Sequence, residues 1–199
     1  MARAGLTADL VTEAAAELAD EVGFDNITVS ALARRFGVAD ASLYSHVKNL
    51  KDLRVRVAVL AARDLADRLA DATAGRAGKE SLAGFASAWR EFARTRPGRY
   101  QATQMPLDAA VVAESPGHLR IMSITYAHLS AYGLPEPDLT DAIRLLRSTY
   151  QGFFSLEASA GFNHPRDLQD SWTKILDVLD VALRHWPSNP QGNDHESPH

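Results

Sequence analysis

The chain has 199 residues, 46% of them apolar and 23% charged, which are ordinary proportions for a globular protein with a buried core. It contains no cysteine, which excludes disulfide scaffolds, thiolate zinc sites and cysteine nucleophiles. The formal net charge of −4 does not by itself indicate nucleic-acid binding. No apolar run approaches the roughly 20 residues that span a bilayer, and no signal peptide opens the chain, so we expect a cytoplasmic protein with no membrane partner.

Apolar residues recur at three- and four-residue intervals, and no stretch alternates in the manner of a β-strand. In the first part of the chain this spacing predicts a helix from the Thr7 cap to Val22 and further helices over residues 29–36, 41–47 and 50–75. The expected N-caps are Thr7, Thr28 and Asn49, with Asp52 completing a capping box after Asn49. Gly23 and Gly37 are the expected helix ends.

A linker at residues 75–78 separates this part from a second helical region. There the spacing predicts helices over about 80–96, 99–103, 116–132, 139–160 and 166–186, while residues 104–115 stay unassigned. The prediction is an all-α protein of about nine helices. Its parts are an amino-terminal helical unit (1–49), a connecting helix (50–75), a second helical unit (76–186) and a disordered polar tail (187–199).

Residues 28–47 contain two short predicted helices that meet at a turn. Ala33, Gly37 four residues later and Leu43 six beyond that have the spacing of a helix-turn-helix. The second helix of that motif lies in the major groove of DNA. It offers small or hydrogen-bonding groups to bases and phosphates, and Tyr44 and Lys48 can reach phosphates. The candidate DNA contacts are Thr28, Ser30, Asp40, Ala41, Ser42, Tyr44, Ser45, His46 and Lys48.

Charge is unevenly distributed around this motif. Residues 33–63 hold seven basic and two acidic side chains, a local charge of +5 in an otherwise acidic protein. Such a face can be an electrostatic footprint for DNA or simply a set of solvated helix surfaces. A generic three-helix packing unit is the alternative reading of the motif itself.

Residues 18–53 closely resemble the DNA-binding domain of the tetracycline-repressor (TetR) family, notably in Val22-Gly23-Phe24, the Thr28 cap and the run from Leu43 to Asn49. Residues 89–100 and 152–157 resemble its WHG-type effector domain, with Gln151 where that pattern usually has His. The resemblance implies a homodimeric transcription factor, usually a repressor, that binds double-stranded operator DNA. It also implies dimerisation through residues 139–186 and a small-molecule effector inside residues 80–180. On this resemblance, residues 1–49 are the expected DNA-binding domain and residues 76–186 the expected ligand-binding and dimerisation domain.

Aromatic residues are concentrated in this effector region, with twelve of the fifteen between Phe85 and Trp186. Some could line an apolar pocket, although ordinary core is the alternative for most of them. The candidate ligand contacts are Phe85, Trp89, Phe92, Tyr100, Tyr126, Tyr150, Phe153 and Glu157. Glu157 could orient a ligand or pair with an arginine such as Arg144 or Arg147.

No catalytic motif, cofactor loop or metal cluster stands out, and the His195 and His199 pair lies in the predicted tail. We therefore expect neither an enzyme nor a bound cofactor or metal. The leading hypothesis is a ligand-responsive DNA-binding repressor. The alternative is an all-α small-molecule binding or scaffold protein whose helix-turn-helix is vestigial.

Overall fold

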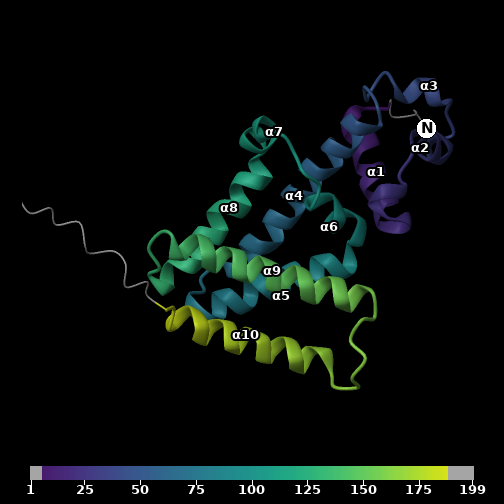
Figure 1. Ribbon diagram of the computed structural model, residues 1–199. Helices are drawn as coiled ribbons and strands as arrows, with labels where there is room; N and C mark the ends of the chain where they lie inside the picture. The colour runs from purple at the N-terminus through teal and green to yellow at the C-terminus, as the bar shows by residue number, and fades with distance from the viewer. Residues whose placement is uncertain (1–5, 188–199) are drawn as a thin grey trace, which may run out of the picture.

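The computed structural model describes residues 6–187, which form ten α-helices and two 3₁₀ turns and contain no strand (Figure 1). The all-α prediction is confirmed. The additional helix is α7 (Ala109–Glu114), which lies in the segment that the sequence left unassigned. The predicted tail, apart from Pro187, lies outside the described residues.

The amino-terminal helices follow their local signals. Helix α1 (Ala8–Val22) begins after Thr7, whose hydroxyl accepts from the amide of Leu10 at 3.1 Å, and ends at Gly23 with φ +91°. A 3₁₀ turn, η1 (Phe24–Asn26), leads to α2 (Val29–Phe36) and then to the short α3 (Asp40–Leu43). The expected caps and the first two helix ranges are therefore confirmed to within two residues.

Helix α4 (Leu50–Thr73) connects the two ends of the molecule (Figure 1). Asn49 caps it by accepting from the amide of Asp52 at 2.9 Å, while the Asp52 carboxylate accepts from the amide of Lys48 rather than that of Asn49. Its first half packs in a core with α1–α3, and its second half packs in a separate core of the bundle. Since one continuous helix enters both cores, a shift of α4 in the bundle reaches α1–α3 directly.

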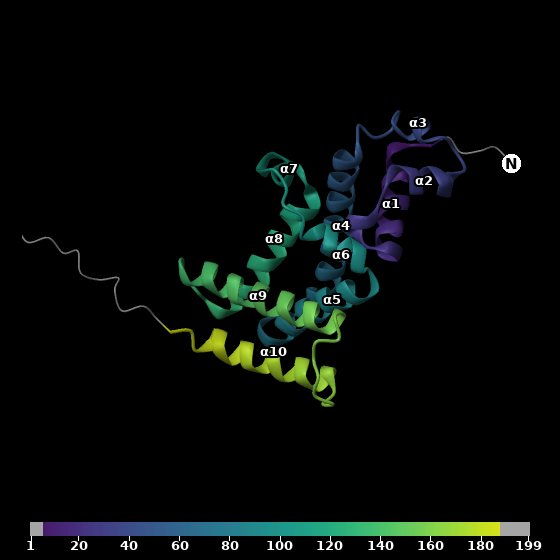
Figure 2. The same ribbon diagram turned by 45° about the vertical axis from the view of Figure 1, so that its right-hand side comes forward.

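The bundle consists of α5 (Gly78–Thr95), α6 (Pro97–Thr103), α8 (Pro116–Leu129), the turn η2 (Ser130–Tyr132), α9 (Asp138–Ala158) and α10 (Leu168–Arg184). Helices α9 and α10 run side by side at the end of the molecule opposite α1–α3, as both ribbon views show (Figures 1 and 2). Trp172 of α10 is fully buried against Phe153 and Phe154 of α9.

Two glycines allow helix backbones to touch. A Cβ on Gly98 of α6 would lie 2.0 Å from the carbonyl of Ala19 in α1, and one on Gly117 of α8 would lie 2.5 Å from the amide of Arg63 in α4. Any larger residue would therefore push the helices apart. These contacts hold α6 and α8 tightly against the helices that carry the amino-terminal domain.

Candidate DNA-binding surface and ligand cavity

The turn between α2 and α3 has the geometry of a helix-turn-helix. Thr28 caps α2 by accepting from the amide of Ala31 at 3.1 Å. Gly37 adopts the left-handed conformation, φ +66° and ψ +36°, and the amide of Val38 donates to the carbonyl of Ala33 at 3.0 Å. Buried Leu32, Ala33 and Leu43 fix the crossing of the two helices. The small residue, the turn glycine and the apolar residue thus occupy the places that their spacing predicts.

The second helix is shorter than expected. The prediction of a helix over residues 41–47 is wrong, since α3 ends at Leu43 and residues 44–46 form turns. The hydroxyl of Ser45 donates to the carbonyl of Ser42 at 2.7 Å, a local bond that competes with the regular helical pattern. The extended Asn49 then starts α4. Tyr44, Ser45 and His46 are therefore presented from a turn.

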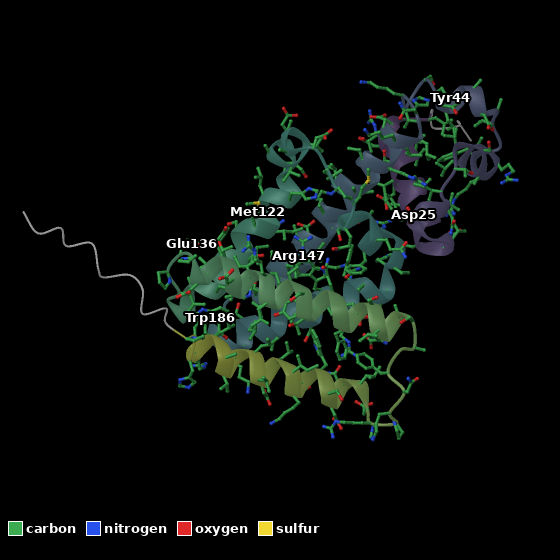
Figure 3. The ribbon with its side chains drawn as sticks, in the orientation of Figure 1. Asp25, Tyr44, Met122, Glu136, Arg147 and Trp186 are labelled. Atoms are coloured by element: carbon green, nitrogen blue, oxygen red, sulfur yellow. The ribbon has the colours of Figure 1, made fainter. Side chains whose placement is uncertain are left out.

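Most candidate DNA contacts lie on the surface of this unit. Tyr44 is 54% exposed and lies at the outer end of the molecule, far from α9 and α10 (Figure 3). His46 is half-buried, and the exposed members are Thr28, Ser30, Asp40, Ala41, Ser42, Tyr44, Ser45 and Lys48. Ser30 donates a hydrogen bond to the carboxylate of Asp40, so these two side chains join α2 to α3. The nine residues thus belong to α2, α3 and the segments that flank them.

The surrounding basic charge is smaller than the sequence suggests. Arg35 faces α1 and pairs with Glu17 at 2.8 Å and Glu21 at 2.7 Å. Arg54 donates to the carbonyl of Asp25 at 2.7 Å, and Arg56 pairs with Asp52 at 3.1 Å. The ion pairs of Arg35 and Arg56 therefore cancel part of the positive charge expected around the helix-turn-helix, and Arg54 is engaged by a backbone carbonyl. Among residues 6–187, Arg34, Lys48 and Lys51 have no ion pair and are exposed.

A buried arginine joins the bundle to the amino-terminal domain. Arg99 of α6 has a side chain only 7% exposed. It contacts Asp20 of α1 at 3.2 Å, Glu13 of α1 at 2.5 Å and the carboxylate of Asp64 in α4. Gln101 of α6 also accepts from the amide of Phe24 at 2.9 Å. This cluster was not predictable from the sequence, because its members are distant along the chain.

An apolar cavity of about 280 Å³ opens between α5, α8 and α9. A second cavity of about 300 Å³ adjoins it toward α4 and α7, and the two share Trp89, Ile121, Met122 and Arg147. Figure 3 labels Met122 on α8 and Arg147 on α9, both exposed at the opening. The first cavity is lined by Phe85, Trp89, Ile121, Met122, Thr125, Tyr126, His128, Ile143, Leu146, Arg147 and Tyr150.

Half of the candidate ligand contacts line this first cavity, namely Phe85, Trp89, Tyr126 and Tyr150. Tyr100 and Glu157 instead line a separate hollow beside α6. Phe92 and Phe153 are buried and line neither of the two adjoining cavities. The cavity residues that the sequence did not single out come from α8 and α9, and their proximity depends on how these helices cross.

Glu157 pairs with an arginine other than the ones expected. Its partner is Arg90 of α5, at 2.6 and 2.9 Å, and not Arg144 or Arg147. The hydrogen bond from Arg90 lowers the pKa of the Glu157 carboxyl. The side-chain amide of Gln151 also has a partner within the chain, since it donates to the side-chain oxygen of Gln104.

Comparison with known proteins agrees with this architecture. A family model for bacterial regulatory proteins of the tetR family matches residues 11–56, and one for a tetracyclin repressor-like C-terminal domain matches residues 82–179. The HTH-type transcriptional regulator YobS of Bacillus subtilis is 31% identical over 173 residues, covering 85% of this chain and 88% of the relative. The chain belongs to the TetR family. The membership identifies a transcriptional regulator rather than an enzyme.

Other members of the TetR family are similar over comparable lengths. The HTH-type regulator Rv0681 of Mycobacterium tuberculosis is 35% identical over 158 residues, 77% of this chain and 71% of the relative. A TetR variant from Acinetobacter baumannii, solved in complex with minocycline, superimposes with a TM-score of 0.69. It is 23% identical, and the match covers 93% of this chain and 100% of that one. This last similarity supports the fold.

Two further findings concern membranes and metals. Within residues 6–187, no helix combines the length and apolarity that crossing a bilayer requires. Over the same range, no three His, Asp or Glu side chains are grouped to hold a metal ion. The His195 and His199 pair lies outside the described residues.

Proposed function

We propose that this TetR-family protein is a homodimeric repressor that leaves its operator when a small molecule enters the α5–α8–α9 cavity. The observation that carries the proposal is the exposed corner formed by Tyr44, Lys48 and the start of α3. Backbone and side-chain groups there can contact phosphates while Ser42 approaches base edges. Such a role would place the protein in the cytoplasm, with the DNA.

The proposed domain division keeps residues 1–49 as the DNA-binding unit, 50–75 as the connection and 76–186 as the effector and dimerisation unit. The nine candidate DNA contacts belong to α2, α3 and the segments that flank them, which supports their assignment. The ligand assignment is supported for the four aromatics that line the cavity, Phe85, Trp89, Tyr126 and Tyr150. The minocycline complex of the similar TetR variant also supports a small-molecule ligand.

Exposed apolar side chains on the last two helices support the dimer. Leu145 and Leu156 of α9 are 38% and 45% exposed, and Val178 and Val181 of α10 are each 57% exposed. Exposed large apolar side chains on neighbouring helices are typical of an interaction surface. Two such helix pairs would form a four-helix bundle between subunits.

Release from DNA would follow from the contacts of α4. Helix α8 forms a wall of the cavity and touches the backbone of α4 at Gly117, while α6 holds α1 through Gly98 and Arg99. A shift of α8 or α6 would therefore move the two α2–α3 units of the dimer relative to each other. Their separation has to stay near one turn of DNA, about 34–36 Å, for both to bind. A ligand that binds more tightly to a conformation with a different separation therefore lowers the affinity for DNA.

Titration of a fluorescent duplex of arbitrary sequence at several salt concentrations tests the proposal. Lys48→Ala should weaken binding to every duplex and reduce the salt slope by about one per bound subunit. Tyr44→Ala should also weaken binding to every duplex. Arg94→Ala, at an exposed arginine of α5, is the matched control and should behave like wild type.

The alternative, a ligand-binding or scaffold protein with a vestigial helix-turn-helix, predicts the opposite result in this titration. It requires that wild type show no binding to DNA even at low salt. Equal affinities for wild type, Lys48→Ala and Tyr44→Ala would likewise count against the proposed surface.

A further inference from the structure

Three buried polar atoms beside the first cavity have no hydrogen-bond partner within residues 6–187. They are Nε1 of Trp89, Nε2 of His128 and the hydroxyl of Tyr150, and all three residues line the cavity. Over the same range only Arg54 Nε and Trp172 Nε1 share this property. A buried polar group without a partner costs roughly 1–3 kcal/mol, so folded proteins contain few of them. Because all three residues line one cavity, a molecule that enters it and shifts these side chains would supply the missing partners.

The chemistry of the three atoms defines what that molecule must carry. The indole N–H of Trp89 can only donate. Nδ1 of His128 lies 3.2 Å from the carbonyl oxygen of Ile124, which can only accept, so Nδ1 carries the proton. Burial lowers the pKa of His128 to about 4, so the ring is neutral near pH 7 and Nε2 accepts a hydrogen bond. Burial also raises the pKa of Tyr150, which therefore keeps its proton.

The charge of the cavity comes from one residue. Arg147 is the only Asp, Glu, Lys or Arg among the residues that line either of the two adjoining cavities, and it contributes to both. Within residues 6–187 it has no ion pair, whereas Arg144 one turn away pairs with Asp141 at 3.3 Å. A guanidinium in this position favours a carboxylate, which it can bind through two parallel hydrogen bonds.

We propose that the cavity binds a small aromatic carboxylic acid that also carries a hydroxyl or N–H group. The carboxylate would meet Arg147 and accept from the two donors, Trp89 Nε1 and the Tyr150 hydroxyl. The aromatic body would lie among Phe85, Tyr126 and Ile121, and the ligand's own donor would reach Nε2 of His128. The inference rests on the proposed function, because it names the class of molecule that the regulator would sense. A volume of about 280 Å³ is at the small end of ligand cavities and suits a body of two fused rings.

Isothermal titration calorimetry of the full protein without DNA tests this with three probes. These are 6-hydroxy-2-naphthoic acid, its methyl ester and 2-naphthoic acid. Wild type should bind the hydroxy acid about tenfold more tightly than the ester, because only the acid forms a charge-assisted hydrogen bond with Arg147. The factor is no larger because this arginine is exposed and solvent screens the interaction. Arg147→Gln should abolish this preference, whereas Arg144→Gln, on the same helix, should preserve it.

The donor is tested with the same probes. Wild type should bind the hydroxy acid several-fold more tightly than 2-naphthoic acid, and His128→Phe should remove that difference while keeping the preference for acid over ester. His128→Phe preserves the ring that stacks on Phe85 at 4.3 Å, so the fold should remain intact, and circular dichroism checks this.

Three results would overturn the inference. They are equal affinity of wild type for acid and ester, a preference for the acid that survives in Arg147→Gln, and no saturable heat from the hydroxy acid at its solubility limit. DNA binding by the same preparations separates the two proposals. Intact DNA binding without acid binding rejects only the ligand class, and acid binding without DNA binding rejects the proposed function.

Discussion

The hydroxyl groups of Tyr132 and Tyr150 differ in their hydrogen bonding, and substitution of each residue by Phe measures the effect on stability. Tyr132 donates to the carboxylate of Asp180 at 2.8 Å, whereas the buried hydroxyl of Tyr150 has no partner within residues 6–187. Tyr132→Phe should lower the free energy of unfolding by about 1–2 kcal/mol, because it removes a hydrogen bond to a charged group. Tyr150→Phe should leave stability unchanged or raise it slightly. Urea denaturation measures both, and an equal loss in the two variants would contradict this assignment.

His128 makes stability depend on pH in a direction that its burial sets. Burial lowers the pKa of the folded ring to about 4, below its ordinary value of 6.5. Between these two values the unfolded chain binds a proton and the folded chain does not. The contribution of neutral His128 to the free energy of unfolding is therefore complete above pH 6.5. It falls by roughly 3 kcal/mol in total as the pH drops toward 4.

His128→Phe removes this group while keeping an aromatic ring against Phe85. From about pH 7 to 5, above the range in which carboxylates titrate, wild type should lose clearly more stability than the variant. His118, whose pKa burial also lowers, contributes to both proteins alike. Parallel curves of unfolding free energy against pH would show that His128 does not titrate in this way.

Among the helices, α6 depends on Arg99 for its position between α1 and α4. Arg99→Met would leave the carboxylates of Asp20 and Asp64 close together, with side chains only 12% and 25% exposed. We expect a loss of about 3 kcal/mol in unfolding free energy, as is usual when one partner of a buried ion pair is removed. Arg94→Met, which breaks an exposed pair with Glu91, is the matched control and should change little. Similar urea midpoints for the two variants would contradict a structural role for this cluster.

Helix ends were predictable from sequence where the determining residues are neighbours. Thr7, Thr28, Asn49 and the glycines at 23 and 37 act within a few positions of the helix that they start or stop. The end of α3 was missed, because the bond from Ser45 to the carbonyl of Ser42 competes with the helical pattern. Helix α7 was also missed, since it has no buried residue and so leaves no apolar stripe.

The candidate DNA-binding surface was also predictable from neighbouring residues, whereas the ligand cavity was not. The α2–α3 corner is local in sequence, and its motif indicated which residues would be exposed. The cavity is assembled from α5, α8 and α9, so aromatic type alone could not separate its lining from core residues such as Phe92 and Phe153. The choice of Arg90 as the partner of Glu157, 67 positions away, depends equally on helix packing.

For the whole molecule, the exposed valines of α10 are the most direct test of the proposed dimer. Val178→Glu would place a charge in the middle of the proposed interface, and we expect the protein to sediment as a monomer at concentrations where wild type is a dimer. Val22→Glu in α1 is the control, since Val22 is 45% exposed and lies outside the two helices of the proposed interface. A dimer that survives Val178→Glu would place the interface elsewhere.

Selection of duplexes from a randomised pool measures most directly whether paired α2–α3 units read DNA. We expect wild type to enrich an inverted repeat whose half-sites lie about 10–10.5 base pairs apart or a multiple of that spacing. Ser42→Ala should change the preferred base at one position of each half-site. A pool that shows no enrichment, or enrichment identical for wild type and Ser42→Ala, would contradict a sequence-reading role for this corner.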